Sequence, residues 1–207
     1  MKWKSSVNIC VSLYENRLEE VSPTWTRLIV SKRYIGMRRR CLETPGRTKM
    51  MEPSFEKLLA RLTDFKVDFI LVGGLAVALN GYVRLTEDID ILLEPSQENV
   101  TRFLECMKGF GEGFGAQLDL NDFNDEEGAI RIVEDSENCQ IDVFMVMGGF
   151  YFRDIEGDAV TVERNNRPLR HASRRSLIRM KSNSQREKDK IDIMALEKLE
   201  EDPGAFD

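Results

Sequence analysis

The chain is poor in the residues that build zinc-bound and disulfide-bonded folds. Its 207 residues include a single histidine, His171, and four cysteines that are scattered without a Cys-x-x-Cys pair. A structural zinc site and a disulfide framework are therefore not indicated, and we expect reduced thiols in a cytoplasmic protein. No apolar run of about 18 residues occurs, so we expect no transmembrane helix. No apolar run with a small-residue cleavage site follows the basic N-terminus, so we expect no signal peptide.

Charge is unevenly distributed around a formal net charge of −6. Residues 1–49 carry 11 Lys/Arg and 4 Asp/Glu, whereas residues 50–207 carry 19 Lys/Arg and 32 Asp/Glu. Within that acidic body, residues 164–190 hold 10 Lys/Arg and 2 Asp/Glu. An acidic body argues against nonspecific coating of nucleic acid, although the basic segment can meet phosphates locally.

Residues 1–50 differ from the rest of the chain. They contain short apolar stretches but no sustained period of a helix or a strand. One interpretation is a basic arm that binds a polyanion. We favour a disordered extension that is not part of the folded unit. Because Met50 and Met51 immediately precede a regular domain, we hypothesise that the functional protein begins there and that the preceding segment is an over-extended reading frame. Residues 51–207 then form the folded domain with its C-terminal helices.

Hydrophobic periodicity predicts alternating helices and strands in residues 51–207. The predicted helices cover residues 52–67, 75–82, 96–111, 175–183 and 185–202. The predicted strands cover residues 68–74, 87–94, 128–135, 138–150, 158–164 and 167–173. Residues 109–128 are glycine- and acid-rich and are predicted to be mostly loop. In the last helix, Ile191, Met194, Ala195 and Leu199 form an apolar stripe.

The stretch Phe69–Leu93 has the richest apolar runs of the chain and also carries acidic residues. On a strand, Asp88 and Asp90 point to the same face, about 6.5–7 Å apart along the chain, while Ile89 and Ile91 face the core. Two carboxylates placed in this way can hold a hard cation such as Mg²⁺. The alternative is a solvated strand edge with outward charges.

Asp142 interrupts the long apolar run CQIDVFMVM. An aspartate in a buried strand needs a partner, because an unpaired buried charge is costly. If this strand lies beside the strand of Asp88 and Asp90, three carboxylates converge, and two Mg²⁺ ions would neutralise them. The alternative is an aspartate that is bonded to backbone or to a nearby arginine.

Two further segments are candidates for phosphate binding. Gly73 and Gly74 lie between a predicted strand and a predicted helix, where glycine lets a ligand approach the backbone and free N–H groups attract phosphate. A tight turn without a ligand is the alternative, and the spacing matches neither GxxxxGK[ST] nor GxGxxG. In the basic segment, Lys181 or Arg186 could steady a triphosphate. The alternatives there are a solvated helix with an Arg186–Asp189 surface pair, or a clamp between helices.

Together these motifs resemble those of the DNA polymerase beta-like nucleotidyltransferase superfamily. Within it, the chain is similar to small prokaryotic proteins that include uncharacterised members, toxins and abortive-infection factors. The resemblance covers about Phe55 to Leu199. It rests on the patterns VGG-x-A, R-x-T-x-DIDIL and LI-x-x-K…R-x-K-D-x-x-D, which here comprise Val72, Gly73, Gly74, Ala76, Arg84, Thr86, Asp88, Asp90, Leu177, Ile178, Lys181, Arg186, Lys188, Asp189 and Asp192.

The resemblance implies an α+β fold, with a mixed sheet flanked by helices over residues 51–207 and an active site at the edge of the sheet. Asp88 and Asp90 would bind both metal ions, and Asp142 would bind the catalytic ion and accept a proton from the attacking hydroxyl. The nucleotide would be held by Gly73, Gly74, Thr86, Lys181 and Arg186. Many superfamily members have Gly-Ser where this chain has Gly73-Gly74, which removes one hydroxyl contact to phosphate.

The function that the resemblance implies is the Mg²⁺-dependent transfer of a nucleoside monophosphate from an NTP to a hydroxyl group. The attack would be in line on the α-phosphorus, with pyrophosphate leaving. The acceptor would be a tRNA end, a protein side chain or a small molecule. An alternative is a catalytically inactive binding module that acts with a partner protein. A role as a toxin held in check by an antitoxin is a further alternative.

Overall fold

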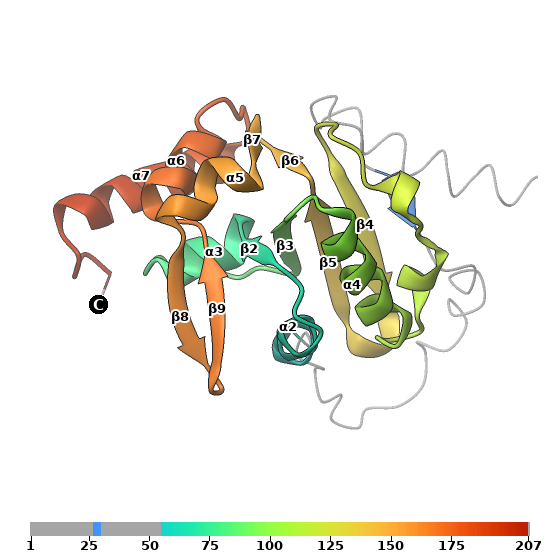
Figure 1. The fold of residues 1–207 in the computed structure, drawn as a ribbon. Coiled ribbons are helices and arrows are strands. Elements are labelled where there is room, and N and C mark those ends of the chain that lie inside the picture. Colours follow the sequence, from blue (N-terminus) through green and yellow to red (C-terminus); the bar gives the residue numbers. More distant parts are fainter. Residues whose placement is uncertain (1–26, 30–54, 207) are drawn as a thin grey trace, which may run out of the picture.

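The computed structural model describes residues 27–29 and 55–206 (Figure 1). The helices of this part are α2 (Phe55–Asp64), α3 (Gly73–Leu79), α4 (Gln97–Lys108), α5 (Phe152–Ile155), α6 (Arg174–Lys181) and α7 (Glu187–Glu201), with short 3₁₀ turns η3 (Phe114–Gln117), η4 (Leu120–Asp122), η5 (Asp135–Glu137) and η6 (Glu156–Asp158). The strands are β1 (Arg27–Ile29), β2 (Phe69–Leu71), β3 (Asp88–Leu93), β4 (Ala129–Glu134), β5 (Cys139–Phe144), β6 (Val146–Met147), β7 (Phe150–Tyr151), β8 (Val160–Arg164) and β9 (Arg167–His171).

Seven of the described strands form one mixed sheet in the order β1-β4-β5-β3-β2-β9-β8. β3 runs parallel to β5 and antiparallel to β2, and β2 runs parallel to β9. In Figure 1, α4 lies over β4 and β5, and α5, α6 and α7 gather at the end of the sheet formed by β8 and β9. The structure therefore confirms the predicted α+β fold with a mixed sheet flanked by helices.

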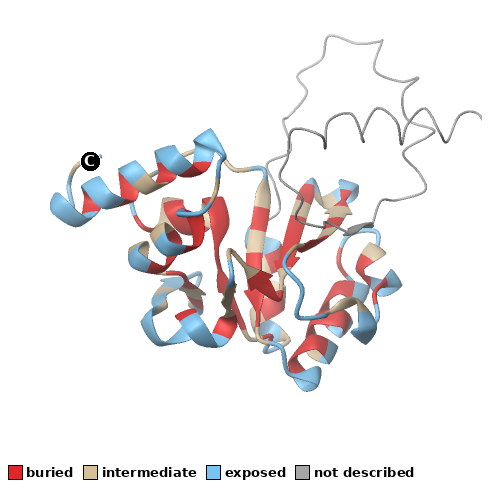
Figure 2. Cartoon of the chain, turned by 90° about the horizontal axis from the view of Figure 1, so that it is seen from above, coloured by how far each residue is buried: buried red, intermediate tan, exposed pale blue. Residues whose placement is uncertain are grey.

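The core lies between the central strands and the inward faces of the helices. Ile89 and Ile91 on β3 and Ile141 on β5 are fully buried, and Leu58 on α2 and Phe103 on α4 pack in the same apolar cluster. Figure 2 shows this as buried residues along the sheet and on one side of each long helix. Each large apolar side chain buried in this way stabilises the fold by about 1.5–3 kcal/mol. The central strands that carry the candidate site are therefore anchored by their opposite face.

Local signals in the sequence set several element boundaries. Ser96 caps α4, because its hydroxyl accepts a hydrogen bond from the Asn99 N–H at 3.3 Å. The two-residue turn between β8 and β9 is formed by Asn165 and Asn166, which both have positive φ angles, as hairpin turns of this length require. α3 begins at Gly73, two residues before its predicted start. The start of α4 and the β8–β9 turn therefore depend on residues close to them in the chain.

The predicted strand over residues 138–150 is interrupted in the structure. β5 ends at Phe144, and the chain continues as the short β6–β7 hairpin, which turns at Gly148 and Gly149 with φ angles of +59° and +79°. The Glu127 carboxylate accepts hydrogen bonds from both glycine N–H groups, at 2.6 and 3.1 Å. A long-range carboxylate contact therefore holds a turn that the apolar run did not reveal.

The apolar stripe predicted on the last helix is wrong for two of its members. Ala195 and Leu199 are buried, but Ile191 and Met194 are exposed on α7. The buried face of α7 is completed by Leu196 and by two charged residues, Asp189 and Asp192. The helix is therefore rotated so that two aspartates, rather than two apolar side chains, face the rest of the molecule.

The predictions for residues 1–50, a disordered basic extension and a start at Met50 or Met51, concern residues outside the described part, apart from β1. This strand pairs in parallel with β4 at one edge of the sheet. None of the described helices has the length and apolar character that crossing a membrane requires.

Candidate metal centre

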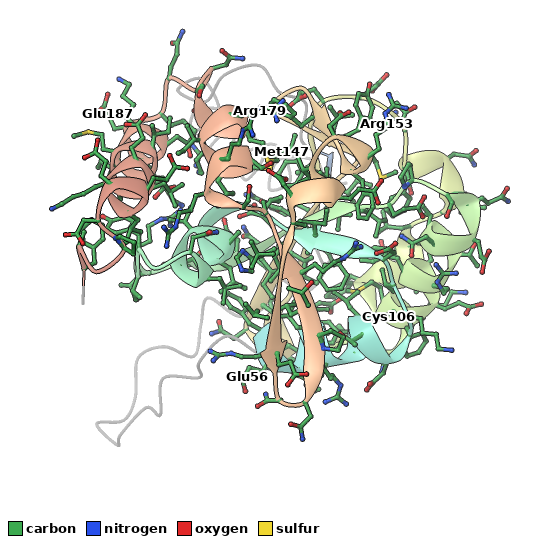
Figure 3. All side chains as sticks on the ribbon, turned by 60° about the vertical axis from the view of Figure 1, so that its left-hand side comes forward. Glu56, Cys106, Met147, Arg153, Arg179 and Glu187 are labelled. Carbon is green, nitrogen blue, oxygen red and sulfur yellow. The ribbon has the colours of Figure 1, made fainter. Side chains whose placement is uncertain are left out.

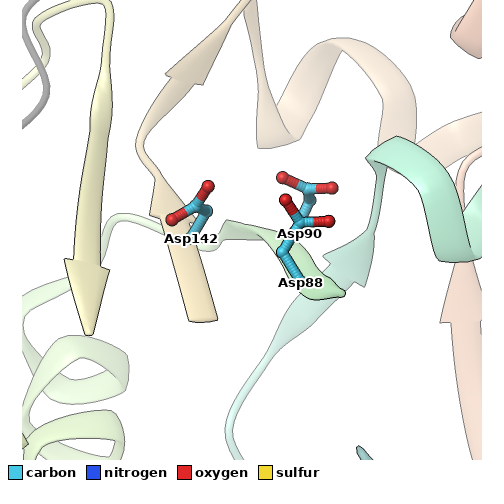
Figure 4. Close-up of side chains that lie close together, drawn as sticks. All are labelled: Asp88, Asp90 and Asp142. Carbon is cyan, nitrogen blue, oxygen red and sulfur yellow. The ribbon is translucent and has the colours of Figure 1, made fainter. Parts of the chain in front are cut away.

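Asp88, Asp90 and Asp142 are brought together by the pairing of β3 with β5. The two strands are parallel neighbours, and their register places Asp90 directly beside Asp142 and Asp88 beside Gln140. Because side chains alternate along a strand, all three carboxylates project from one face (Figure 4). The predicted convergence of the three acids is therefore present. It lies on central strands, so the expected position at the edge of the sheet is wrong.

The three carboxylates are close enough to share a cation. One oxygen from each lies within 4.8 Å of the other two, and Asp142 is only 4% exposed. Burial raises the pKa of Asp90 to about 7, and the negative charges of Asp88 and Asp142 raise it further. The Gly74 N–H and the Lys181 charge act in the opposite direction and do not cancel this shift. Burial and the neighbouring carboxylates therefore favour the protonated form of Asp90 when no cation is bound.

Thr86 holds Asp88 in place. Its hydroxyl lies 2.9 Å from Asp88 Oδ1 and 3.2 Å from the Asp88 carbonyl oxygen, and it donates toward both. A hydroxyl so placed restricts the rotation of the carboxylate and leaves Asp88 Oδ2 without this contact. The structure thus places Thr86 beside a candidate metal ligand, where its hydroxyl positions that ligand.

Gly73 and Gly74 lie against the same cluster. Gly73 has a φ angle of +58°, and a Cβ at this position would overlap the Asp90 carboxylate. A Cβ on Gly74 would lie 2.7 Å from Thr86 Oγ1 and 2.9 Å from an Arg84 nitrogen. The Gly74 N–H donates to Asp90 Oδ2 at 3.4 Å, a long hydrogen bond. The two glycines therefore make room for the acidic cluster and present backbone to it.

Arg131 belongs to the site and was not among the predicted residues. It lies opposite Asp142 in the register of β4 and β5, and it donates from Nε and a terminal nitrogen to the two Asp142 oxygens, at 2.7 and 2.6 Å. The arginine-paired alternative for Asp142 is thus present. It does not exclude a metal ion, because a carboxylate has about four lone-pair sites and a bidentate arginine takes two of them. The only signal in the sequence was an arginine at a strand position otherwise flanked by apolar residues.

Lys181 belongs to a buried clamp. Its ammonium group contacts both Asp189 and Asp192, and Arg84 donates to the two Asp192 oxygens at 2.8 and 3.0 Å. This network joins α6, α7 and the segment that leads into β3, as the clamp alternative described. The clamp affects the metal centre indirectly. Arg84 fixes the segment that carries Thr86, and the Lys181 charge lowers the pKa of Asp90.

Arg186 lies apart from that clamp. Its side chain is 64% exposed, and its nearest acidic contact is Asp189 at 3.9 Å. A contact at this distance with a solvent-exposed cation contributes little to stability. The structure therefore separates the two cations that the sequence suggested as triphosphate contacts: Lys181 is buried in ion pairs, and Arg186 faces solvent.

The chemistry available at this centre is that of clustered oxygen ligands. Three carboxylates on a rigid sheet suit a hard divalent cation, and the backbone of the glycine pair lies beside them. No family model and no curated protein matches the chain.

Proposed function

We propose that this protein is a Mg²⁺-dependent nucleotidyltransferase that moves a nucleoside monophosphate from an NTP to a hydroxyl acceptor. The observation that carries the proposal is the convergence of Asp88, Asp90 and Asp142 on two adjacent parallel strands, with their oxygens within 4.8 Å. The motif resemblance supports the same activity and the same three acids.

The donor set fits a magnesium site. Mg²⁺ prefers oxygen ligands and is commonly held by one or two carboxylates together with water and substrate phosphates. Asp88 and Asp90 supply such ligands, and the pKa of Asp90 is raised first by burial and then by the charges of Asp88 and Asp142, which a cation would offset. We assign Asp142 as the third ligand and propose two ions, which together would neutralise the three carboxylates. When bound, the ions would neutralise charge that develops on the reacting phosphate.

The residues around the cluster have distinct roles in this proposal. Thr86 and Arg131 orient Asp88 and Asp142 through the hydrogen bonds described above. Gly73 and Gly74 allow the triphosphate to approach the backbone beside Asp90. In the reaction, the acceptor oxygen bonds to the α-phosphorus, the bond to the β-phosphate oxygen breaks, and pyrophosphate leaves. The hydroxyl proton passes to a carboxylate of the cluster, for which we assign Asp142.

The finer assignments follow from the resemblance. We propose a cytoplasmic enzyme whose acceptor is a tRNA end, a protein or a small molecule. A role as the toxin of a toxin–antitoxin pair fits the same chemistry. Lys181 and Arg186 remain proposed nucleotide contacts, Lys181 acting through the charge that it places near Asp90 and Arg186 as an exposed cation.

The test is the transfer of label from α-labelled NTPs, with Mg²⁺, to tRNA, cell proteins or small-molecule extracts. We expect transfer by the wild-type chain and a loss of at least about 100-fold in Asp90→Asn, because metal-assisted charge stabilisation is worth several kcal/mol. Glu105→Gln, which neutralises an exposed carboxylate on α4, is the matched control and should retain activity. Equal transfer by wild type and Asp90→Asn would contradict the proposal.

A second candidate, an inactive module that binds a nucleotide and a partner protein, is favoured by one observation. Both Asp142 oxygens accept hydrogen bonds from Arg131, which competes with their use as metal ligands. Calorimetric titration with each NTP separates the two functions. Metal-dependent binding without transfer to any acceptor supports the module, whereas transfer that depends on Asp142 supports the enzyme.

A further inference from the structure

The outer face of α7 and a neighbouring segment carry the most exposed large apolar side chains of the described residues. Leu85 is 96% exposed, Val83 83%, Met194 69% and Ile191 52%. Figure 2 shows the outer side of α7 as largely exposed along its length. Ile191 and Met194 share the outer face of α7, and exposed apolar side chains that share one helix face are typical of a surface that another molecule covers.

The segment of Val83 and Leu85 is fixed to α7. Arg84, between them, donates two hydrogen bonds to Asp192 on the buried side of the helix. Val83, Leu85 and Glu87 are exposed while Arg84 and Thr86 are partly buried, as expected for an extended chain. The clamp thus fixes this segment, with its two exposed apolar side chains, to the side of α7 that carries Asp192.

On α7, the exposed apolar residues belong to a stripe of four residues: Glu187, Ile191, Met194 and Lys198. Their spacing of i, i+4, i+7 and i+11 places them on one line along a helix, and all four are exposed. Figure 3 shows Glu187 at the N-terminal end of α7. The stripe therefore has an acidic end, an apolar centre and a basic end.

The stripe is complementary to a second copy of itself that runs in the opposite direction, because the acidic end of each copy then faces the basic end of the other. If two copies of α7 pair antiparallel about a two-fold axis between Ile191 and Met194, Ile191 faces the partner's Met194, and Glu187 faces the partner's Lys198. Lys190, beside the stripe, then lies near Glu197 of the partner subunit. A two-fold contact uses the same patch on both copies, so it requires a patch that is complementary to itself. Binding to a different protein would not require this property.

We propose that the protein forms a homodimer through antiparallel pairing of α7 along the Glu187–Ile191–Met194–Lys198 stripe. Within one protomer, Glu187 bonds to Lys190 at 2.6 Å, and the Lys198 ammonium lies 5.3 Å from the centre of the Phe206 ring. These contacts are exposed and individually weak, so exchanging them for contacts across the dimer costs little. The stripe lies on the face of α7 opposite Asp189 and Asp192, so the proposal does not depend on the activity assigned to the metal centre.

Sedimentation velocity of the full chain over a range of concentrations tests this proposal. We expect a monomer–dimer equilibrium in the wild type. Glu187→Lys and Lys198→Glu should each raise the dissociation constant at least tenfold, because each places like charges across the dimer. Glu187→Lys/Lys198→Glu should restore the wild-type constant to within threefold, because it exchanges the two charges and keeps the pairs complementary. Glu200→Lys, an exposed change on α7 outside the stripe, is the control and should leave the constant unchanged.

Mixing the two single variants gives the sharpest outcome. Each is weakened alone, but a heterodimer of Glu187→Lys with Lys198→Glu restores opposite charges at both ends of the helix pair. Dimer formation on mixing therefore supports the antiparallel arrangement. A wild-type chain that is monomeric at all concentrations, or a dimer that none of these variants changes, would overturn the proposal, and circular dichroism of each variant confirms that it is folded.

Discussion

Asp90 is the residue on which the constraints of the metal centre converge. Its carboxylate lies beside Asp88 and Asp142, accepts a hydrogen bond from Gly74 and occupies the space that a Gly73 side chain would need. Burial and like charges together favour its protonated form, which is why its pKa is raised. Changes at or beside Asp90 should therefore alter stability and Mg²⁺ binding, and both can be measured without a known substrate.

Replacing Gly73 by alanine should both strain the backbone and displace Asp90. A left-handed φ costs a non-glycine residue about 1–2 kcal/mol, and the new Cβ would overlap the carboxylate. Gly149→Ala is the matched control, because Gly149 also has a positive φ but has open space around its Cβ position. We expect Gly73→Ala to lose at least about 1 kcal/mol more than Gly149→Ala in urea unfolding, and to bind Mg²⁺ more weakly. Equal losses would show that Asp90 is not packed against Gly73.

The raised pKa of Asp90 predicts the pH dependence of stability in the absence of metal. Its folded pKa of about 7 exceeds 3.8, the ordinary value for an aspartate, so at intermediate pH the folded state keeps a proton that the unfolded state has released. Its contribution to stability is therefore fully present below about pH 4 and is lost as pH rises from there through about 7. Urea unfolding in chelator between about pH 5 and 7 should show a fall in stability with pH that is smaller in Asp90→Asn, by up to about 1.4 kcal/mol per pH unit.

Other groups titrate in the same range. Burial also raises the pKa of Glu134 to about 7 and lowers that of His171. Both groups are common to the wild type and Asp90→Asn, so the difference between the two chains isolates Asp90. Identical slopes would contradict the assignment. Mg²⁺ affinity should increase over the same pH range, because the proton and the cation compete for the carboxylate.

At the scale of elements, the fold positions the site through strand register and through the clamp between α6 and α7. Register decides that Asp142 lies beside Asp90 and that Arg131 lies beside Asp142. The clamp decides where the segment before β3 runs, because Arg84 on that segment is bonded to Asp192 on α7. A disturbance at α7 should therefore reach the metal centre through this segment.

Asp192→Asn tests that coupling. Asp192 is fully buried and neutralises both Arg84 and Lys181, so its replacement leaves buried positive charge without a full partner. Breaking a buried pair in this way typically costs about 3–5 kcal/mol, whereas Arg186→Ala, which removes the exposed member of the same motif, should cost less than about 1 kcal/mol. Chemical unfolding measures both, and isothermal titration should show weaker Mg²⁺ binding in Asp192→Asn alone. Comparable losses in the two variants would show that the clamp is not structural.

At the scale of the whole molecule, the buried residues described in the structure extend from Leu58 to Leu199. The candidate site, the clamp and the proposed dimer stripe all lie in this range. β1 adds three residues at an outer edge of the sheet, beside β4. The buried residues that the structure describes therefore lie within residues 51–207.

A chain that begins at Met51 should fold by itself. We expect cooperative thermal unfolding, followed by circular dichroism, with a midpoint within about 5 °C of that of the full chain, because only a short edge strand among the described elements is lost. Mg²⁺ binding should be retained, since no residue of the cluster is removed. The absence of a cooperative transition would show that the first fifty residues are needed for folding.

The sequence by itself determined the type and approximate position of most helices and strands, and the pairing of Asp88 with Asp90 on one face. These features depend on neighbours within a few residues: the period of two along a strand, the Ser96 cap and the Asn165–Asn166 turn. Only the tertiary structure decided the register that adds Asp142 and Arg131 and the direction in which Lys181 points. It also decided the rotation of α7, where Arg84 and Lys181 hold Asp189 and Asp192 in the interior and leave Ile191 and Met194 exposed. The buried face of α7 is set by ion pairs with other segments of the chain. The hydrophobic periodicity of the helix itself does not indicate this face.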